Sequence, residues 1–194
     1  MTRLFCATGN AGKLREFRMA AGHAAVDIEL LPNFRDLPEA IEDGATFDEN
    51  AVKKALHYGR GVSGLLFADD SGLEVDALGG APGVYSARFS GPDATDDSNN
   101  RLLLEKLNGV ENRAARFVCS IALVEGDQVR GIYRGAVPGR IIDAPRGPGG
   151  FGYDPLFYYE PFGCTFGEAS ADQKFTVSHR GQALLAMLTD LGLR

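Results

Sequence analysis

The amino-acid sequence predicts an α/β fold with a mixed β-sheet. In the first half of the chain, short apolar runs alternate with helix-like segments, which is typical of strand–helix–strand units. In the second half, apolar runs at 115–124 and 129–136 are separated by Glu-Gly-Asp-Gln, which favours a hairpin. This change of pattern would suit two lobes with a cleft between them.

The first elements follow from apolar runs and the turns between them. Residues 3–7 form a short apolar run that ends at Thr8-Gly-Asn-Ala-Gly12, which predicts a strand followed by a turn. Residues 13–21 carry apolar side chains on one helical face and predict a helix. Residues 26–31 predict a second strand, and the acidic, proline-containing segment 36–44 predicts a loop.

Capping and strand patterns predict the next elements. Thr46-Phe-Asp-Glu49 has the form of a capping box and opens a helix that we expect to end near Tyr58. Residues 65–68 form a buried-strand run that stops at Asp69-Asp-Ser-Gly72, the place where ligand-binding residues usually lie in an open α/β sheet. A helix follows over about 95–107, with Thr95 at its start.

The remaining elements complete one domain. Residues 73–78 form a further apolar segment, residues 139–143 extend the hairpin ribbon, and residues 178–191 form an amphipathic helix. The chain contains no internal repeat, low-complexity tract or clear linker. We therefore expect a single domain over residues 1–194.

The composition is that of an ordinary globular protein, with 44% apolar and 24% charged residues. No apolar run approaches the roughly 18 to 20 residues that a membrane span needs, so we expect a soluble protein. The N-terminus lacks a signal peptide's apolar core. Cys6, Cys119 and Cys164 are odd in number and form no CxxC pair, which argues against disulfides and zinc and favours the cytoplasm.

The net charge of −6 gives no general attraction to nucleic acid or to an anionic membrane. An anionic ligand would therefore need a local group of cations or a metal ion. Glycine is over-represented, with 25 residues in 194, and its clusters mark the segments where we look for function.

The first candidate segment is Thr8-Gly9-Asn10-Ala11-Gly12-Lys13, between a predicted strand and a helix N-terminus. Backbone N–H groups at such a place favour a phosphate or a carboxylate, and Lys13 adds a positive charge. The segment is not a Walker A loop, because the glycine spacing is short and Leu14 replaces Ser or Thr. A plain glycine turn is the structural alternative.

The second candidate is a group of acids that could bind a metal ion. Asp69 and Asp70 are adjacent, and Glu39, Glu42 and Asp43 lie in the preceding acidic loop. Adjacent carboxylates repel each other, so a site that keeps both ionised usually holds a cation, and oxygen ligands favour magnesium or manganese. A turn cap at Asp69 and a solvated acidic loop are the alternatives.

Two later segments complete the candidate set. The glycine-rich run 147–155 carries Phe151, Tyr153 and Asp154 and could let an aromatic ring stack on a flat group. Lys174 and Ser178-His179-Arg180 predict a cationic patch at a helix start. A glycine-rich turn with core aromatics, and a capped surface helix, are the respective alternatives.

Together the four segments predict a nucleotide site with a phosphate loop, metal-binding carboxylates, an aromatic platform and cations. No GxSxG motif is present and the cysteines lack a catalytic partner, so covalent catalysis has little support. Attack of water on a phosphate is the simpler chemistry.

The motifs TGNAGK, FADDSGLEVDALGGAPGVYSARFSG, GGFGYDPLF and SHRGQA occur in this order over nearly the whole chain. With them the sequence resembles the non-canonical purine nucleoside triphosphate pyrophosphatases, also called inosine triphosphate pyrophosphatases. The resemblance implies hydrolysis of ITP, dITP and XTP to the monophosphate and pyrophosphate with Mg²⁺. It also implies a cytoplasmic homodimer and an elongated fold with the active site between two lobes.

The resemblance also assigns roles to residues. It implies that Asp70 is the general base or a metal ligand and that Glu42 is the loop's metal ligand, with Glu39 as the alternative after a one-residue slip. Substrate contacts are implied for the phosphate loop, a helix lysine, the serine after the acids, the glycine-rich run and the late cations, namely Thr8, Gly9, Asn10, Ala11, Gly12, Lys13, Lys54, Ser71, Phe151, Gly152, Tyr153, Asp154, Lys174, His179 and Arg180.

Two other functions fit part of the pattern. A sensor that binds nucleoside triphosphates without hydrolysing them would keep the phosphate loop but would not need the adjacent acids. A related pyrophosphatase acting on dTTP or UTP would share the general fold, but the SHR segment and the FGYD loop argue against it.

Overall fold

The computed structural model describes residues 1–194, which divide into two compact units. The first unit comprises Met1–Asp70, Cys119–Gly135 and Ser178–Arg194. The second unit comprises Ser71–Val118 and Ala136–Val177. The chain therefore passes between the units within strands as well as at a helix start.

The predicted α/β class with a mixed sheet is confirmed. Seven strands are hydrogen-bonded in the order β2-β1-β3-β4-β5-β6-β7. Strand β1 is parallel to β2 and β3, whereas β6 is antiparallel to β5 and β7. The strands are β1 (Thr2–Cys6), β2 (Val26–Leu30), β3 (Leu65–Val75), β4 (Ala114–Glu125), β5 (Gln128–Ile141), β6 (Phe157–Tyr159) and β7 (Cys164–Thr165). The α-helices are α1 (Ala11–Ala21), α2 (Phe47–Gly59), α3 (Asp96–Lys106), α4 (Ala171–Val177) and α5 (His179–Asp190).

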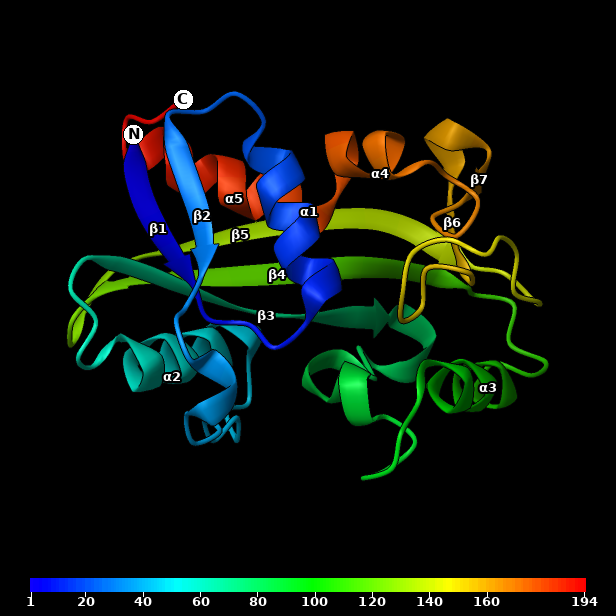
Figure 1. Cartoon of the computed structure of the whole chain (residues 1–194). Coiled ribbons are helices and arrows are strands. Elements are labelled where there is room, and N and C mark those ends of the chain that lie inside the picture. Colours follow the sequence, from blue (N-terminus) through cyan, green and yellow to red (C-terminus); the bar gives the residue numbers. More distant parts are fainter. The chain divides into compact units, whose positions relative to one another are not determined.

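The first unit has three layers. Helices α1 and α5 cover one face of its part of the sheet, and α2 covers the other face (Figure 1). Because successive strand residues point to opposite faces, Phe67 of β3 packs with α1 and α5, whereas its neighbours Leu66 and Ala68 pack with α2. The same alternation along β3 decides where its charged residues point.

The largest difference from the predicted elements is the length of β3. The sequence predicts a strand that stops at Asp69, but β3 continues to Val75 and includes both aspartates. The expected end was wrong because Asp-Asp-Ser-Gly is a turn-like composition, whereas here each carboxylate has a partner on its own face of the strand. Gly72 is needed inside β3, because a Cβ atom there would lie 2.3 Å from the Ser86 hydroxyl oxygen.

Side-chain caps fix the helix starts. Thr46 accepts a hydrogen bond from the Glu49 N–H at the start of α2, as predicted, but the Glu49 carboxylate accepts from Ala45 N–H rather than closing a reciprocal box. Thr95 and Ser98 form a complete capping box at α3. The predicted helices over 46–58, 95–107 and 178–191 are therefore confirmed within one or two residues.

Helix α1 and the hairpin differ slightly from the expectation. Helix α1 begins at Ala11, two residues before the predicted start, because Asn10 caps it. Strand β5 runs without a break to Ile141, so the expected extension at 139–143 is part of the same strand. Gly126, with a φ of 61°, makes the turn between β4 and β5.

The second unit has its own apolar core. Leu73, Phe117, Leu156, Phe157 and Phe166 are among its buried residues. Strands β6 and β7 and helix α4 belong to this unit and are not among the predicted elements. None of the helices in either unit combines the length and apolar character that a membrane span requires.

Candidate active site

Asp69 and Asp70 point to opposite faces of β3, because they are consecutive residues of one strand. Asp69 lies on the face covered by α1 and α5, where its carboxylate contacts Lys13 and Arg180. Asp70 lies on the face covered by α2, where its carboxylate accepts a hydrogen bond from Asn50. The two acids therefore differ in chemistry, although both are stabilised by the charges of Lys13 and Lys54, and the charge of Asp69 raises the pKa of Asp70.

Asp69 is the centre of a buried group of charges. The Lys13 ammonium lies 2.8 Å from its carboxylate and the Arg180 guanidinium 3.9 Å from it, and the Lys54 ammonium donates to its backbone carbonyl at 3.0 Å. Burial raises the pKa of the Asp69 carboxyl, but the charges of Lys13, Arg180 and Lys54 outweigh burial and lower its pKa from 3.8 to about 2. Asp69 is therefore an ionised anchor for these cations.

Asp70 has the opposite electrostatic balance. Its side chain is 8% exposed, and Asn50 Nδ2 donates to one carboxylate oxygen at 3.0 Å. Burial raises the pKa of the Asp70 carboxyl, and the Lys54 charge and the Asn50 hydrogen bond only partly offset this rise. A carboxylate with a raised pKa, near the surface, is a better proton acceptor than an ordinary aspartate.

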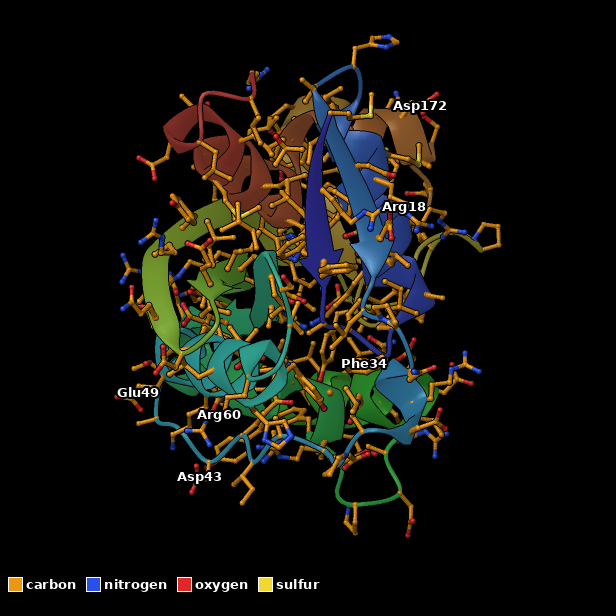
Figure 2. All side chains as sticks on the ribbon, turned by 60° about the vertical axis from the view of Figure 1, so that its left-hand side comes forward. Arg18, Phe34, Asp43, Glu49, Arg60 and Asp172 are labelled. Carbon is orange, nitrogen blue, oxygen red and sulfur yellow. The ribbon has the colours of Figure 1, made fainter.

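The acidic loop supplies one further carboxylate to this place. Glu42 forms a 2.8 Å ion pair with Lys54, whereas Glu39 is exposed. Asn50 Oδ1 accepts the Gly44 N–H at 2.8 Å, so the side chain that contacts Asp70 also fixes the loop. Asp43 lies at the outside of the unit (Figure 2) and pairs with Lys53. Of the loop acids, Glu42 is thus the one that the structure brings to Lys54.

The charges in this group do not cancel. Three cations and four acids are joined by contacts or by electrostatic coupling, which gives a formal charge of −1 when all are ionised. They are Lys13, Lys54, Arg180, Glu16, Glu42, Asp69 and Asp70. A group with this charge would repel a polyanion unless a further cation joined it.

The loop between β1 and α1 is exposed at residues 9–11, as a ligand-binding loop should be. The Asn10 side chain accepts from Gly12 N–H at 2.8 Å and from Lys13 N–H at 3.1 Å. Two N–H groups of the first helical turn are therefore already bonded inside the protein. Thr8 is buried and its hydroxyl oxygen accepts from Asn10 N–H.

The second unit assembles the aromatic residues. The Lys174 ammonium forms a 2.6 Å ion pair with Asp154 and lies 5.0 Å from the centre of the Phe151 ring. It also lies 5.7 Å from the Phe166 ring, which is a cation–π arrangement on two rings. The Tyr153 hydroxyl donates to the Ser86 carbonyl at 2.7 Å, so this ring is a buried structural support. Ser71, the first residue of this unit, is half-buried in β3.

The cations of the predicted patch, Lys174 and Arg180, are each buried beside an acidic partner. Lys174 is buried with Asp154 in the second unit, and Arg180 is buried in a 2.8 Å ion pair with Glu16 in the first unit. His179 is 1% exposed. The sequence analysis did not foresee these partners, which are needed because a buried cation without an acid is strongly destabilising.

Glu16 and Asn50 complete the site but were not assigned to it from the sequence, and Asp69 was named only as a member of the acidic pair. Asp69 stands out only as a neighbour of Asp70. Glu16 precedes Phe17 on the buried side of α1, and an acid at such a position is a signal that could have identified it. Asn50 has no sequence signal, because its two hydrogen bonds exist only after α2 has packed on β3.

A family model described as the Ham1 family matches residues 4–190. A dITP/XTP pyrophosphatase of Syntrophobacter fumaroxidans is 53% identical over 184 residues, which cover 95% of this chain and 79% of that protein. A dITP/XTP pyrophosphatase of Geobacter sulfurreducens is 49% identical, with 99% of this chain and 98% of that protein covered. A solved structure of a HAM1 protein from Coxiella burnetii matches with a TM-score of 0.88 and 37% identity, over 99% of each chain.

Proposed function

Because the chain belongs to the Ham1 family, we propose that it hydrolyses the non-canonical purine nucleotides ITP, dITP and XTP to the monophosphate and pyrophosphate. The protein is then a hydrolase of nucleotide metabolism that acts on phosphoric anhydride bonds and removes these nucleotides from the pool. The observation that carries the proposal is Asp70, a buried carboxylate with a raised pKa beside the half-buried cations Lys54 and Lys13.

Asp70 is the proton acceptor in this proposal. Water attacks the α-phosphorus, the bond from this phosphorus to the bridging oxygen breaks, and pyrophosphate leaves. The water proton passes to the Asp70 carboxylate, the general base in this proposal. Asn50 holds one carboxylate oxygen and so orients the group.

A divalent metal ion fits the residues of the first unit. Glu42 and Asp70 offer oxygen ligands. The negative charges of both carboxylates raise the pKa of Lys54, and Glu42 also forms an ion pair with it. Mg²⁺ commonly binds one or two carboxylates together with waters and substrate phosphates, so it does not need a protein cage of three acids. It would change the formal charge of the group from −1 to +1. Bound there, Mg²⁺ would neutralise phosphate charge and lower the pKa of a bound water.

The cations bind the triphosphate in this proposal. A nucleoside triphosphate carries about four negative charges, and Lys13 and Lys54 stabilise the charge that develops on the leaving pyrophosphate. In the loop from Thr8 to Gly12, residues 9–11 are exposed, and we propose that the loop contacts the phosphates at the start of α1. Lys13 forms an ion pair with Asp69, and Lys54 forms one with Glu42. In the proposal each ammonium group keeps its acidic partner and also donates a hydrogen bond to a phosphate oxygen.

The base contacts that we assign to the second unit are Phe151, Gly152, Asp154 and Lys174. For His179 and Arg180 in the first unit, a base contact stays a prediction from the sequence, as does a substrate contact for Ser71, which follows Asp70. Phe151 supplies a ring for stacking, and the Lys174 ammonium is a donor for an oxo group of a 6-oxopurine. This contact would discriminate against ATP, because the 6-amino group of ATP and the Lys174 ammonium are both hydrogen-bond donors and cannot bond to each other. Tyr153 supports the loop through Ser86.

We also propose that both units form one catalytic domain over residues 1–194 and that the protein is a cytoplasmic homodimer. The family model spans both units, which supports one domain. The three free cysteines suit a reducing compartment. We expect no nucleic acid partner, because the net charge is −6.

Product analysis tests the function. With ITP and Mg²⁺ we expect IMP and pyrophosphate, and with the chelator EDTA we expect the activity to disappear. IDP and orthophosphate as products would contradict cleavage at the α-phosphorus. Binding of ITP without any product would favour a sensor, and preference for dTTP or UTP over ITP would favour the pyrimidine-specific alternative.

A further inference from the structure

Helix α3 holds the glycine-rich loop of the second unit at one residue. The Gly152 N–H donates to the Asp96 carboxylate at 2.7 Å, and the Gly152 carbonyl accepts from Asn100 Nδ2 at 2.9 Å. Asp96 and Asn100 are four residues apart and therefore lie on one side of α3. One helix face thus binds both polar backbone groups of one loop residue.

The backbone conformation of the loop at Gly152 depends on glycine. Gly152 has a φ of 63°, a left-handed conformation that favours glycine. Phe151 precedes it, and the Phe151 N–H donates to the Asp154 carboxylate at 2.9 Å. That carboxylate also binds Lys174. The loop is therefore held by Asp154 from within and by α3 from the other side.

Helix α3 is itself firmly placed in the second unit. Its first turn has a complete capping box of Thr95 and Ser98. Asn99 accepts from the Ser90 N–H at 2.8 Å and donates to the Ser86 carbonyl at 3.3 Å. Because Ser86 also accepts from Tyr153, the helix and the loop share a buried hydrogen-bonding partner.

One atom of the Asn100 side chain lowers the stability of the fold. Its Oδ1 atom is buried and has no hydrogen-bond partner. An unsatisfied buried acceptor destabilises a protein, and a leucine, which has the same branching and number of side-chain heavy atoms, has no acceptor to leave unsatisfied. The hydrogen bond from Nδ2 to Gly152 is what a leucine could not supply.

We propose that Asp96 and Asn100 are positioning residues for base recognition, which act by fixing Gly152 and hence the Phe151 ring beside the Lys174 ammonium. This inference rests on the proposed function, in which Phe151 and Lys174 contact the purine. Without the two hydrogen bonds the loop has more conformations available, so the base site must be ordered when substrate binds. Binding weakens, whereas the chemistry at Asp70 is unchanged.

The test compares Asp96→Ala, Asn100→Leu, Asp96→Asn and Asp97→Ala by steady-state kinetics with ITP, by calorimetric IMP binding and by thermal unfolding. Asp96→Asn keeps an acceptor for Gly152 N–H, and Asp97 is an exposed acid in the same helical turn. We expect Asp96→Ala and Asn100→Leu to raise KM and weaken IMP binding about 3- to 10-fold, as for one lost hydrogen bond, with kcat within about twofold. Asp96→Asn and Asp97→Ala should resemble the wild type, and Asn100→Leu should not lower Tm.

The outcomes separate this inference from the proposed function. If the wild type hydrolyses ITP but Asp96→Ala and Asn100→Leu keep its KM and IMP affinity, the positioning role is wrong and the function stands. If Asn100→Leu lowers Tm and kcat together, the residue is merely structural and the inference is again wrong. If the wild type neither hydrolyses ITP nor binds IMP, both are wrong.

Discussion

At the scale of single residues, Asp70 carries the most specific prediction. Burial raises its pKa and Asn50 orients it, and the role that we propose for it is to accept a proton and to balance a divalent cation. An amide can do neither. We expect Asp70→Asn to lower kcat by at least about 10²-fold while thermal unfolding is little changed. A folded Asp70→Asn protein with near-normal turnover would remove Asp70 from the mechanism.

Asp69 should contribute to stability rather than to proton transfer. Its folded-state pKa is about 2 against an ordinary value of 3.8, so its stabilising effect is fully present above 3.8 and is lost as the pH falls toward 2. A depression of this size corresponds to about 2 kcal/mol. We expect Asp69→Asn to lose roughly this free energy of unfolding at pH 7 in urea denaturation.

The pH dependence provides the control for Asp69. The difference in unfolding free energy between the wild type and Asp69→Asn should shrink as the pH is lowered from 3.8 toward 2, because the wild-type carboxyl becomes protonated there. A difference that stays constant over this range would mean that packing, and not charge, causes the destabilisation.

At the scale of elements, the close approach of β5 to α5 leads us to predict the effect of a side chain at Gly135. A Cβ atom on Gly135 would lie 2.1 Å from the His179 carbonyl oxygen and 2.8 Å from the Ala183 nitrogen. Both atoms are backbone, so the start of α5 must move, and overpacking of this kind costs about 1–3 kcal/mol. We expect Gly135→Ala to lower Tm and also to reduce activity, since His179 and Arg180 begin this helix.

Gly131→Ala is the matched control on the same strand. The atoms nearest to a Cβ atom there belong to the Tyr133 side chain and not to the backbone, so this side chain can shift at the cost of its hydrogen bond to Asp190. We expect this variant to keep its activity, because Gly131 lies apart from the start of α5. Equal loss of activity in Gly131→Ala and Gly135→Ala would contradict the prediction, because the loss could then not be assigned to displacement of the start of α5.

The elements that the sequence could predict are those with local signals. Thr46, Thr95 and Ser178 mark helix starts through their own hydroxyl groups, and the structure has a cap at each. Strands β6 and β7 have three and two residues, which is too short for a period to be visible. Helix α4 has only seven residues and was missed for the same reason.

The site was predictable in its segments but not in its pairings. The contact of Asn50 with Asp70 joins residues 20 positions apart, and that of Glu16 with Arg180 joins residues 164 apart. Such pairings depend on how α2 and α1 pack on the sheet, which no local pattern encodes. The same packing places two adjacent aspartates in different surroundings, so their separate roles could not be read from the sequence Asp-Asp.

At the scale of the whole molecule, the three thiols should differ in reactivity. Cys6 and Cys119 are buried, and burial raises the pKa of both thiols, whereas Cys164 is partly exposed. We expect a thiol reagent to modify one cysteine in the native protein and three in denaturant, counted by mass spectrometry. Rapid modification of two or three in the native state would show that the first unit opens readily.

The alternation of Asp69 and Asp70 across β3 has a consequence for sequence change. Substitutions leave the phase of a strand intact, but deletion of one residue between Leu65 and Asp69 would rotate every later side chain to the other face. Asp70 would then take the place of Asp69 beside Lys13 and Arg180, and Asp69 would take the place of Ala68 on the face that α2 covers. Length variation in this stretch of chain should therefore be far more damaging than replacement of its apolar residues by others of similar size.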